Sequence, residues 1–278
     1  LWLDRGSRLP FDLMVRQRAG GQFRTRILPL DAKAQAANAT GRPTPFALDP
    51  GRSVKMLAPG IAYLRPGPFY NPDGEAWDNR AFVAFIDRAF ADFAAAGASS
   101  LIIDLRDNPG GDSSFSDPMI AWIADRPWRF AARFTIRASP EAEASNAERL
   151  AAAHKAGFAD PVSPVFARLL KGAAPGALVD FPLTDSQPRA GGRFAGKIYA
   201  LIDRYCFSNC ANVAAILQDY RFATIIGEPT ADLVTTQGAM EHFTLPRTGI
   251  RVGFAKARIV RPNGDEREAG VTPDVAIA

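Results

Sequence analysis

A serine between two cysteines is the most distinctive candidate for chemistry in the sequence. The segment Cys206-Phe207-Ser208-Asn209-Cys210 follows a predicted buried strand and opens a predicted helix. A serine on such a turn is exposed near the positive end of the helix, which suits a nucleophile. Ser208 is also well placed to be the N-cap of that helix, a role that serines often take. Cys210 is a competing nucleophile, but inside the helix it is expected to pack as a small hydrophobic residue.

A glycine turn is the second candidate. The segment Asn108-Pro109-Gly110-Gly111 stands where another buried strand is predicted to end, and ligands of α/β folds bind at that edge of the sheet. Glycines have no Cβ, so the backbone N–H groups of Gly110 and Gly111 can point at an approaching oxyanion. A tight turn that binds nothing explains the same residues equally well.

A serine nucleophile needs a general base, for which the sequence offers Lys256 and His242. Strand alternation places Lys256 on one face with Val252 and Phe254, where burial favours a neutral amine that can accept a proton. A lysine that reaches from an edge strand into solvent fits the same pattern. His242 is the alternative base. Its neighbour Glu241 points to the opposite face of the strand and cannot readily orient it.

The composition limits the class of protein that can carry these residues. The chain has 278 residues, of which 47% are hydrophobic and 22% charged, so it is not a disordered chain. Its 23 glycines and 22 prolines make turns frequent and argue against an all-helical bundle. The formal charge of +4 is scattered along the chain, so nucleic acid is not an expected partner.

Membrane spans, disulfide frameworks and metal sites are not expected either. No apolar run approaches the ~20 residues that cross a bilayer. Two cysteines four residues apart exclude a disulfide framework, and neither histidine stands at zinc-ligand spacing from them. The predicted chemistry needs no metal and no cofactor.

The alternation of helix, buried strand and glycine turn predicts an α/β layered fold. The apolar face of the first helix, which starts near Asp78 and ends at Gly97, holds Phe82, Phe85, Ile86, Ala89, Phe90 and Phe93. Strands are predicted at residues 11–16, 23–30, 60–64, 100–105, 197–202, 223–226, 240–245 and 250–260. Further helices are predicted from Ser116 or Asp117 to residue 123, at 141–157, after Ser163-Pro164, and at 209–220.

The domain boundaries lie where this alternation of strands and helices is interrupted. Residues 1–37 form a hairpin too small to fold alone, with a turn at Gly20-Gly21, and the proline-rich residues 38–55 are a linker. Residues 56–278 are the main core, interrupted by an insertion at 126–195 that we expect to lie over the core. That insertion should cover the cleft between Gly110 and Ser208. The chain starts at Leu1 without an initiator Met or a signal pattern, so we expect it to be a piece of a longer protein.

Five blocks, in order along residues 56–278, resemble the tail-specific (C-terminal processing) serine proteases. They are LIIDLRDNPGG at 101–111, FSN at 207–209, IGEPT at 226–230, RPNG at 261–264 and GVTPD at 270–274. Each block is short, but their common order is specific. The opening residues, with Leu9-Pro10-Phe11 and Gly20-Gly21, are similar to the end of the PDZ-type domain of that family. The first half of such a domain would lie upstream of Leu1.

The resemblance implies a crotonase/ClpP-like core of layered sheet and helices with endopeptidase activity. Ser208 falls at the nucleophile position, and the N–H groups of Gly110, Gly111 and Asn209 fall at the oxyanion hole. Proteases of this family act on protein or peptide substrates, namely exported or exposed protein tails in bacteria. A bacterial cell-envelope or periplasmic location is therefore implied, with the signal region outside this chain. An oligomer is compatible with the sequence but not required by it.

Departures from the family concern the base. Tail-specific members carry a lysine shortly after the block at 227–230, but residues 231–236 read ADLVTT and no lysine occurs between Lys197 and Lys256. Related tricorn-type proteases use a histidine from far upstream, and none precedes His154 here. The acidic residue one helical turn after the serine is replaced by Ala211 and Asn212. Three explanations follow. The base has moved to another position in this chain, for which Lys256 is the favoured candidate, or it is supplied upstream of Leu1, or it is lost.

The sequence therefore predicts a serine endopeptidase that works through an acyl-enzyme intermediate. The alternative is a catalytically inactive protease-like module that binds peptides or apolar ligands. A crotonase-type acyl-transfer enzyme is the third interpretation, and the least favoured, because nothing basic is placed to bind a nucleotide phosphate.

Overall fold

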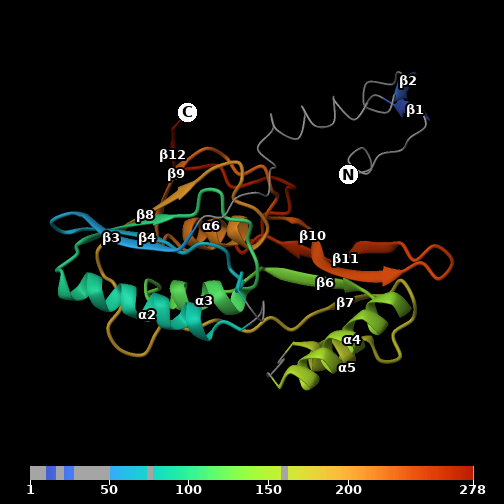
Figure 1. The fold of residues 1–278 in the computed structure, drawn as a ribbon, viewed down its shortest axis with the longest axis horizontal. Coiled ribbons are helices and arrows are strands. Elements are labelled where there is room, and N and C mark those ends of the chain that lie inside the picture. The colour runs from blue at the N-terminus through green and yellow to red at the C-terminus, as the bar shows by residue number, and fades with distance from the viewer. Residues whose placement is uncertain (1–10, 17–21, 28–50, 74–77, 158–161, 278) are drawn as a thin grey trace. The chain divides into compact units, whose positions relative to one another are not determined.

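The computed structural model of the chain describes residues 11–16, 22–27, 51–73, 78–157 and 162–277 (Figure 1). The chain divides into two units, Leu1–Leu48 and Asp49–Ala278. In the first unit, β1 (Phe11–Arg16) and β2 (Gln22–Ile27) pair antiparallel, which confirms the predicted hairpin. The expected turn at Gly20-Gly21 lies outside the described residues.

A six-stranded sheet forms the centre of the second unit, in the order β12-β9-β8-β5-β4-β3. Its strands are β3 (Ser53–Ala58), β4 (Ile61–Arg65), β5 (Ser100–Asp104), β8 (Lys197–Ile202), β9 (Thr224–Gly227) and β12 (Val275–Ala276). Only the β3–β4 pair is antiparallel, so the sheet is mostly parallel. The carboxyl ends of β5 and β8 meet at the same edge, so both candidate turns follow neighbouring strands. β3 begins at Ser53, inside the predicted linker.

Three helices accompany this sheet: α2 (Arg80–Ala95), α3 (Ser113–Ala121) and α6 (Asn209–Asp219). α2 buries the apolar face that its periodicity predicted, with Phe85 only partly buried, and it lies beside α3 (Figure 1). Nine successive residues of α6, from Asn209 to Leu217, are buried. The helix that begins at Ser208 is therefore a central element of the core and not a surface helix.

The predicted start of α3, at Ser116 or Asp117, is three or four residues too late. The helix begins at Ser113, capped by the carboxylate of Asp112, and Pro118 lies inside it. A proline there has no N–H to donate to the carbonyl of Ser114, four residues earlier. The Asn79 Nδ2 donates to that carbonyl at 2.7 Å and replaces the missing bond. The proline is tolerated because a distant side chain satisfies the freed acceptor.

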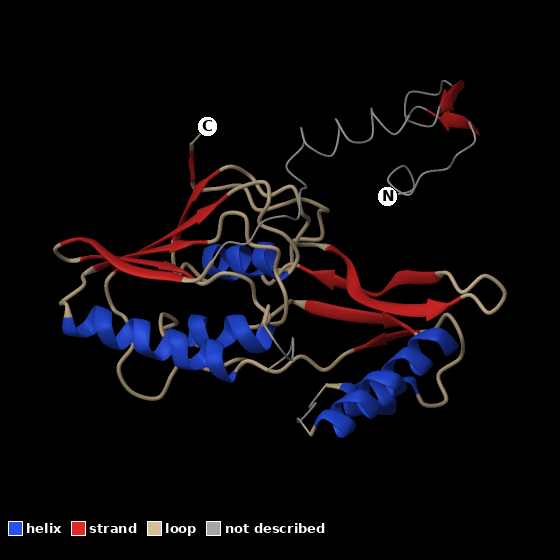
Figure 2. Cartoon of the chain, viewed as in Figure 1, coloured by secondary structure: helices blue, strands red, loops and turns tan. Residues whose placement is uncertain are grey.

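A second, four-stranded antiparallel sheet has the order β10-β11-β6-β7. It is built from β6 (Arg133–Arg137), β7 (Leu178–Asp180), β10 (Thr236–Thr244) and β11 (Arg251–Val260). Helices α4 (Pro140–Ala156) and α5 (Ser163–Leu170) accompany it and share a separate apolar cluster with it (Figure 2). The middle of the predicted insertion thus combines with the closing strands of the chain to form one body with its own core, while Trp128 and Phe194, near its two ends, are buried in the main core.

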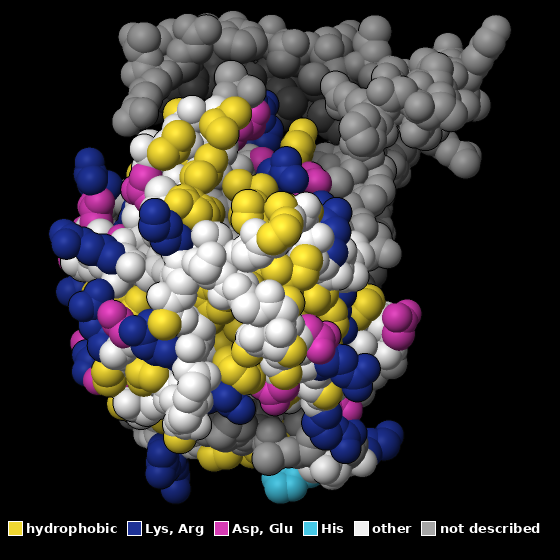
Figure 3. All heavy atoms as spheres, turned by 90° about the vertical axis from the view of Figure 1, so that its left-hand side faces the viewer, with side chains coloured by type: hydrophobic (Ala, Val, Ile, Leu, Met, Phe, Trp, Pro, Cys, Tyr) yellow, Lys and Arg dark blue, Asp and Glu magenta, His cyan; other side chains and the backbone are white. Residues whose placement is uncertain are grey.

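The surface carries hydrophobic side chains among charged ones. Met56, Leu57 and Ile61, at the turn between β3 and β4, are exposed. Figure 3, which faces that end of the sheet, shows Lys and Arg interspersed with Asp and Glu. In the described part of the chain, no helix is long and apolar enough to cross a membrane.

Candidate active site

Ser208 occupies the sharp turn between β8 and α6 with a strained backbone. Its φ is +54° and its ψ is −125°, a region that costs a non-glycine residue on the order of 1–3 kcal/mol. Ser208 is exposed, and its side chain makes no capping hydrogen bond to the described backbone of α6. The interpretation of Ser208 as a simple helix cap is therefore wrong, and its hydroxyl is available for another role.

The backbone on both sides of Ser208 is held by hydrogen bonds. The Phe207 N–H donates to the Asn108 carbonyl at 3.0 Å, which joins the two candidate turns. The Ser208 N–H donates to Asp232 Oδ2, while Asp232 Oδ1 accepts from the Leu233 N–H at 3.0 Å. Sequence reasoning missed Asp232, although it lies in the stretch where the family's lysine is absent. Its acidic side chain in that stretch was the available signal.

A disulfide bond joins Cys206 to Cys210 across the turn. Cys210 is buried inside the helix, as expected, but it is half of a disulfide and therefore not the competing thiol nucleophile. The helix starts only at Asn209, so Cys206 lies in the preceding turn, and the two Cα atoms are 5.3 Å apart. That separation falls within the range that a disulfide spans. Both cysteines are fully buried.

Gly110 touches the turn that carries Ser208 directly. A Cβ built on Gly110 would lie 2.4 Å from the Phe207 carbonyl oxygen and 2.8 Å from both the Asn209 nitrogen and the Ser208 Cβ. Its φ of +85° is also one that a side chain disfavours. Only a glycine allows the two turns to approach this closely. The structure thus brings together Ser208, Asn209 and Gly110, as the sequence predicted.

The N–H groups around this contact differ in their partners. The Gly110 N–H donates to Asn108 Oδ1 at 2.8 Å, within its own turn. Among the described residues, no acceptor is present for the N–H of Gly111 or of Asn209. Asn209 is the first residue of α6, where helix N–H groups have no partner inside the helix. Of the three predicted oxyanion donors, Gly111 and Asn209 thus have N–H groups without a protein partner among the described residues, whereas the Gly110 N–H is used within its own turn.

Buried amide side chains fix the two turns. Asn108 donates from Nδ2 to the Gly67 carbonyl at 2.7 Å, and Asn209 donates from Nδ2 to Ser116 Oγ at 3.0 Å. Ser116 belongs to α3, so the start of α6 is tied to the helix that follows the glycine turn. Buried hydrogen bonds of this kind help to specify one arrangement of a core, although Asn209 Oδ1 has no partner among the described residues.

Asp117, the next residue of α3, is a buried carboxyl group. Its Oδ2 accepts from Ser186 Oγ at 2.7 Å. Burial, which this hydrogen bond only partly offsets, raises the pKa of Asp117 to about 6. The group therefore titrates in a range where an ordinary aspartate is already ionised.

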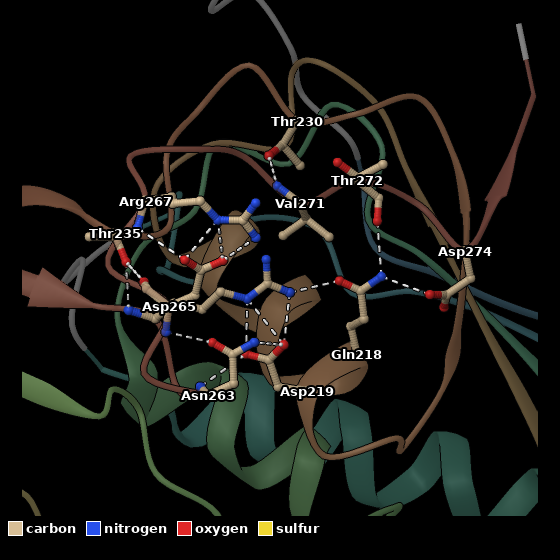
Figure 4. A network of polar contacts seen from close by, with 11 residues as sticks. Gln218, Asp219, Thr230, Thr235, Asn263, Asp265, Arg267, Val271, Thr272 and Asp274 are labelled. Carbon is tan, nitrogen blue, oxygen red and sulfur yellow. Dashed lines mark hydrogen bonds and ion pairs between the residues drawn. The ribbon is translucent and has the colours of Figure 1, made fainter.

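The far end of α6 is held by an ion pair. Arg261 binds Asp219 through Nε at 3.0 Å and Nη2 at 2.8 Å, and it reaches Gln218 Oε1 at 2.7 Å. Asn263 donates from Nδ2 to Asp219 at 3.0 Å. Figure 4 shows Asp219 and Gln218 facing the loops that carry Asn263 and Thr272. The RPNG block thus anchors the helix that begins at Ser208.

Lys256 lies in the second body. Its ammonium forms a hydrogen-bonded ion pair with Glu241 and stands 3.7 Å above the centre of the Phe166 ring, in a buried position. Arg149 of α4 also binds Glu241, at 2.7 Å. Burial alone would raise the pKa of Glu241, but the hydrogen bonds from Arg149 and Lys256 outweigh it and lower the pKa below its usual value. The face that the sequence predicted to be largely apolar thus holds an ionised cluster.

His242 lies on the other side of its strand. The register pairs it with Gly253, and its ring stands over that glycine, where it is exposed. Glu241 is buried beneath the same strand, so the two adjacent residues point to opposite faces, as expected. Within the described residues, no group of three or more His, Cys, Asp or Glu side chains could hold a metal ion.

Comparisons with known proteins point to one family. The sequence model of peptidase family S41 matches residues 77–277. None of the curated proteins matches the chain. A solved putative peptidase from Parabacteroides merdae ATCC 43184 is similar, with a TM-score of 0.55 and 20% identity over 87% of this chain and 62% of its own.

Two further solved structures share the fold. The S499A mutant of CPAF gives a TM-score of 0.58 at 16% identity, covering 96% of this chain and 62% of its own. The photosystem II D1 C-terminal processing protease gives a TM-score of 0.50 at 16% identity, covering 96% and 55%. This chain therefore spans less than two thirds of the length of these structures.

Proposed function

The chain belongs to peptidase family S41, and from this we propose that it is a serine endopeptidase with Ser208 as its nucleophile. One observation carries the proposal: an exposed serine is held in a strained turn against Gly110, and its hydroxyl does not cap the helix. Proteins retain such strain where the surrounding structure supports it, most often at functional sites.

The proposed reaction follows from these residues. Ser208 Oγ attacks the carbonyl carbon of the scissile peptide bond, and its proton passes to a general base. The N–H groups of Gly111 and Asn209 stabilise the oxyanion of the tetrahedral intermediate, with Gly110 providing the room for their approach. The C–N bond then breaks, the amine leaves with a proton from the base, and water hydrolyses the acyl-enzyme to regenerate Ser208.

We propose that the base is Lys256, His242 or a residue outside these 278. Lys256 can act only if its ammonium leaves Glu241 and loses a proton, because a charged lysine accepts none. His242 is exposed and needs no such release. The ion pair thus counts against Lys256, and a variant that removes both charges of the pair decides its role.

The proposed substrates are proteins or peptides, as the family implies. We further propose that the core is of the crotonase/ClpP-like type, that residues 1–37 are the end of a PDZ-like domain, and that the insertion at 126–195 gates long substrates. The hairpin of β1 and β2 supports the second point. A bacterial periplasmic or envelope location is supported by the disulfide, since such bonds persist in oxidising compartments.

A second candidate function is a protease-like module that binds peptides or apolar ligands without cleaving them. The pairing of Lys256 with Glu241 favours it, because the lysine is then a structural cation and, of the two candidate bases in this chain, only His242 is left. This module would keep the oxyanion donors and the exposed serine but would turn over no substrate.

Labelling with a fluorophosphonate distinguishes the two functions. The purified chain is incubated with the probe, and the modified residue is identified by peptide mass mapping. Covalent modification at Ser208, absent in Ser208→Ala, is expected for the endopeptidase. Peptide binding without any modification of Ser208 would instead support the inactive module.

A further inference from the structure

The disulfide between Cys206 and Cys210 encloses the proposed nucleophile. Ser208 is the middle residue of the five that the bridge closes, and it has the positive φ of this turn. The bridge joins a residue of the turn before α6 to a residue of its first turn. Nothing in the family resemblance requires cysteines at these two positions.

Both ends of the bridge also contact the strands that lead to the site. The Cys206 N–H donates to the Asp203 carbonyl at 3.2 Å, just after β8. Cys210 Sγ lies 3.3 Å from the Leu105 carbonyl oxygen, just after β5. β5 and β8 are neighbours in the sheet. The bridge therefore sits between the strand that leads to the glycine turn and the strand that leads to Ser208.

We propose that the Cys206–Cys210 disulfide is a positioning element that holds Ser208 in its reactive conformation, an inference that rests on the proposed function. Without the bridge, Ser208 can relax to the extended backbone of an ordinary N-cap. Its hydroxyl then bonds a free N–H in the first turn of α6. In that state the oxygen caps the helix and no longer faces a substrate carbonyl. Reduction thus converts the nucleophile into a cap.

The chemistry of this conversion needs a reductant, which we specify as a dithiol. One thiolate attacks a disulfide sulfur, the S–S bond breaks, and a mixed disulfide forms. The second thiolate of the reductant then attacks the mixed disulfide and releases the cysteine that was bound to the reductant. Two thiols are left on the protein and one cyclic disulfide on the reductant, a two-electron exchange. Because both cysteines are buried, a local opening of the turn must precede attack.

The expected effect is a loss of reactivity without a loss of fold. The backbone conformation of Ser208 is strained, and strain of this size lowers the population of a conformation about tenfold or more once the disulfide that restrains it is broken. We therefore expect reduction with dithiothreitol to slow fluorophosphonate labelling of Ser208 at least tenfold. The kcat for a peptide substrate should fall in parallel while KM stays unchanged, since substrate contacts are not altered.

The experiment compares three samples: oxidised chain, reduced chain and the double variant C206A/C210A. Labelling rate, circular dichroism and free-thiol count by mass spectrometry are measured on each. The double variant should label as slowly as the reduced chain and should not respond to dithiothreitol. Reoxidation of the reduced chain should restore the original rate, which excludes damage by the reagent.

Hydrogen exchange on the same samples separates this inference from the proposed function. Faster exchange confined to residues 206–212 is expected on reduction, with α2 unchanged as an internal control. If the oxidised chain does not label at Ser208, the proposed function fails, and exchange alone decides the inference. Unchanged labelling in a folded chain with two free thiols would overturn the inference, as would unchanged exchange at residues 206–212.

Discussion

Replacing Gly110 by alanine is expected to separate the glycine turn from the nucleophile. The new methyl would lie 2.4 Å from the Phe207 carbonyl oxygen and 2.8 Å from the Ser208 Cβ. The φ of +85° costs alanine about 1 kcal/mol, and overpacking adds roughly 1–3 kcal/mol. The variant should therefore lose about 2–4 kcal/mol of unfolding free energy, or shift the Ser208 turn to relieve the contact.

Gly97→Ala is the matched control for this substitution. Gly97 has a φ of +63°, and among the described residues no atom would lie within 4 Å of a Cβ added to it. The Gly97→Ala variant should lose only about 1 kcal/mol of unfolding free energy, from the backbone strain, and should label at the rate of the parent. Urea unfolding gives the free energies, and fluorophosphonate labelling reports on the site. A displacement near 1 Å slows catalysis about a hundredfold, so Gly110→Ala should label far more slowly. Equal labelling of both variants would refute this reasoning.

Three further predictions concern single groups. Ser208→Ala should abolish labelling and proteolysis with an unfolding free energy within about 1 kcal/mol of the parent; cleavage of casein at the parental rate would contradict it. The pKa of Asp117 rises from 3.8 to about 6 on folding, so stability present at low pH is lost as the pH rises through 6. That loss of unfolding free energy is about 3 kcal/mol. Urea titrations between pH 4 and 7 should show that Asp117→Asn removes this dependence of stability on pH. Lys256→Met should cost about 3 kcal/mol by leaving Glu241 partly unpaired, while K256M/E241Q should recover stability and still label. A folded double variant that does not label would assign the base to Lys256.

The sequence could predict the elements that repeat a strong pattern. The apolar period of α2 and the buried runs of β5 and β8 are local signals, and each lies within a few residues of its predicted place. The turn after β8 was found because strand, serine and helix follow one another directly. The sequence did not reveal β7, which has three residues and an exposed Leu178, because its pairing with β6 depends on residues about forty positions away.

The partners of the candidate residues were harder to predict than the residues themselves. Alternation along β11 correctly placed Lys256 on a buried face. Its counter-ion comes from the neighbouring strand and its ring contact from α5, and neither is visible from spacing alone. The disulfide was missed for a related reason. Cys210 was expected inside the helix as a small hydrophobic residue, and the sequence does not show that the strained turn at Ser208 brings Cys206 within bonding distance of it.

Four of the five blocks that carry the family resemblance contain the start of α6 or contact that helix, the last of them through Gln218, which donates to the Thr272 carbonyl and to Asp274. Gly110 contacts the start of the helix, while Arg261 binds its end through Asp219. Val271 donates to Thr230 Oγ1 at 2.9 Å, which ties the last block to the IGEPT block. These contacts fix Ser208 and the start of α6, but none of them involves Lys256 or His242. Because the Ser208 N–H is bound by Asp232 and the turn packs against Gly110, while Ser208 itself is exposed, we expect a base to approach the hydroxyl from the solvent side.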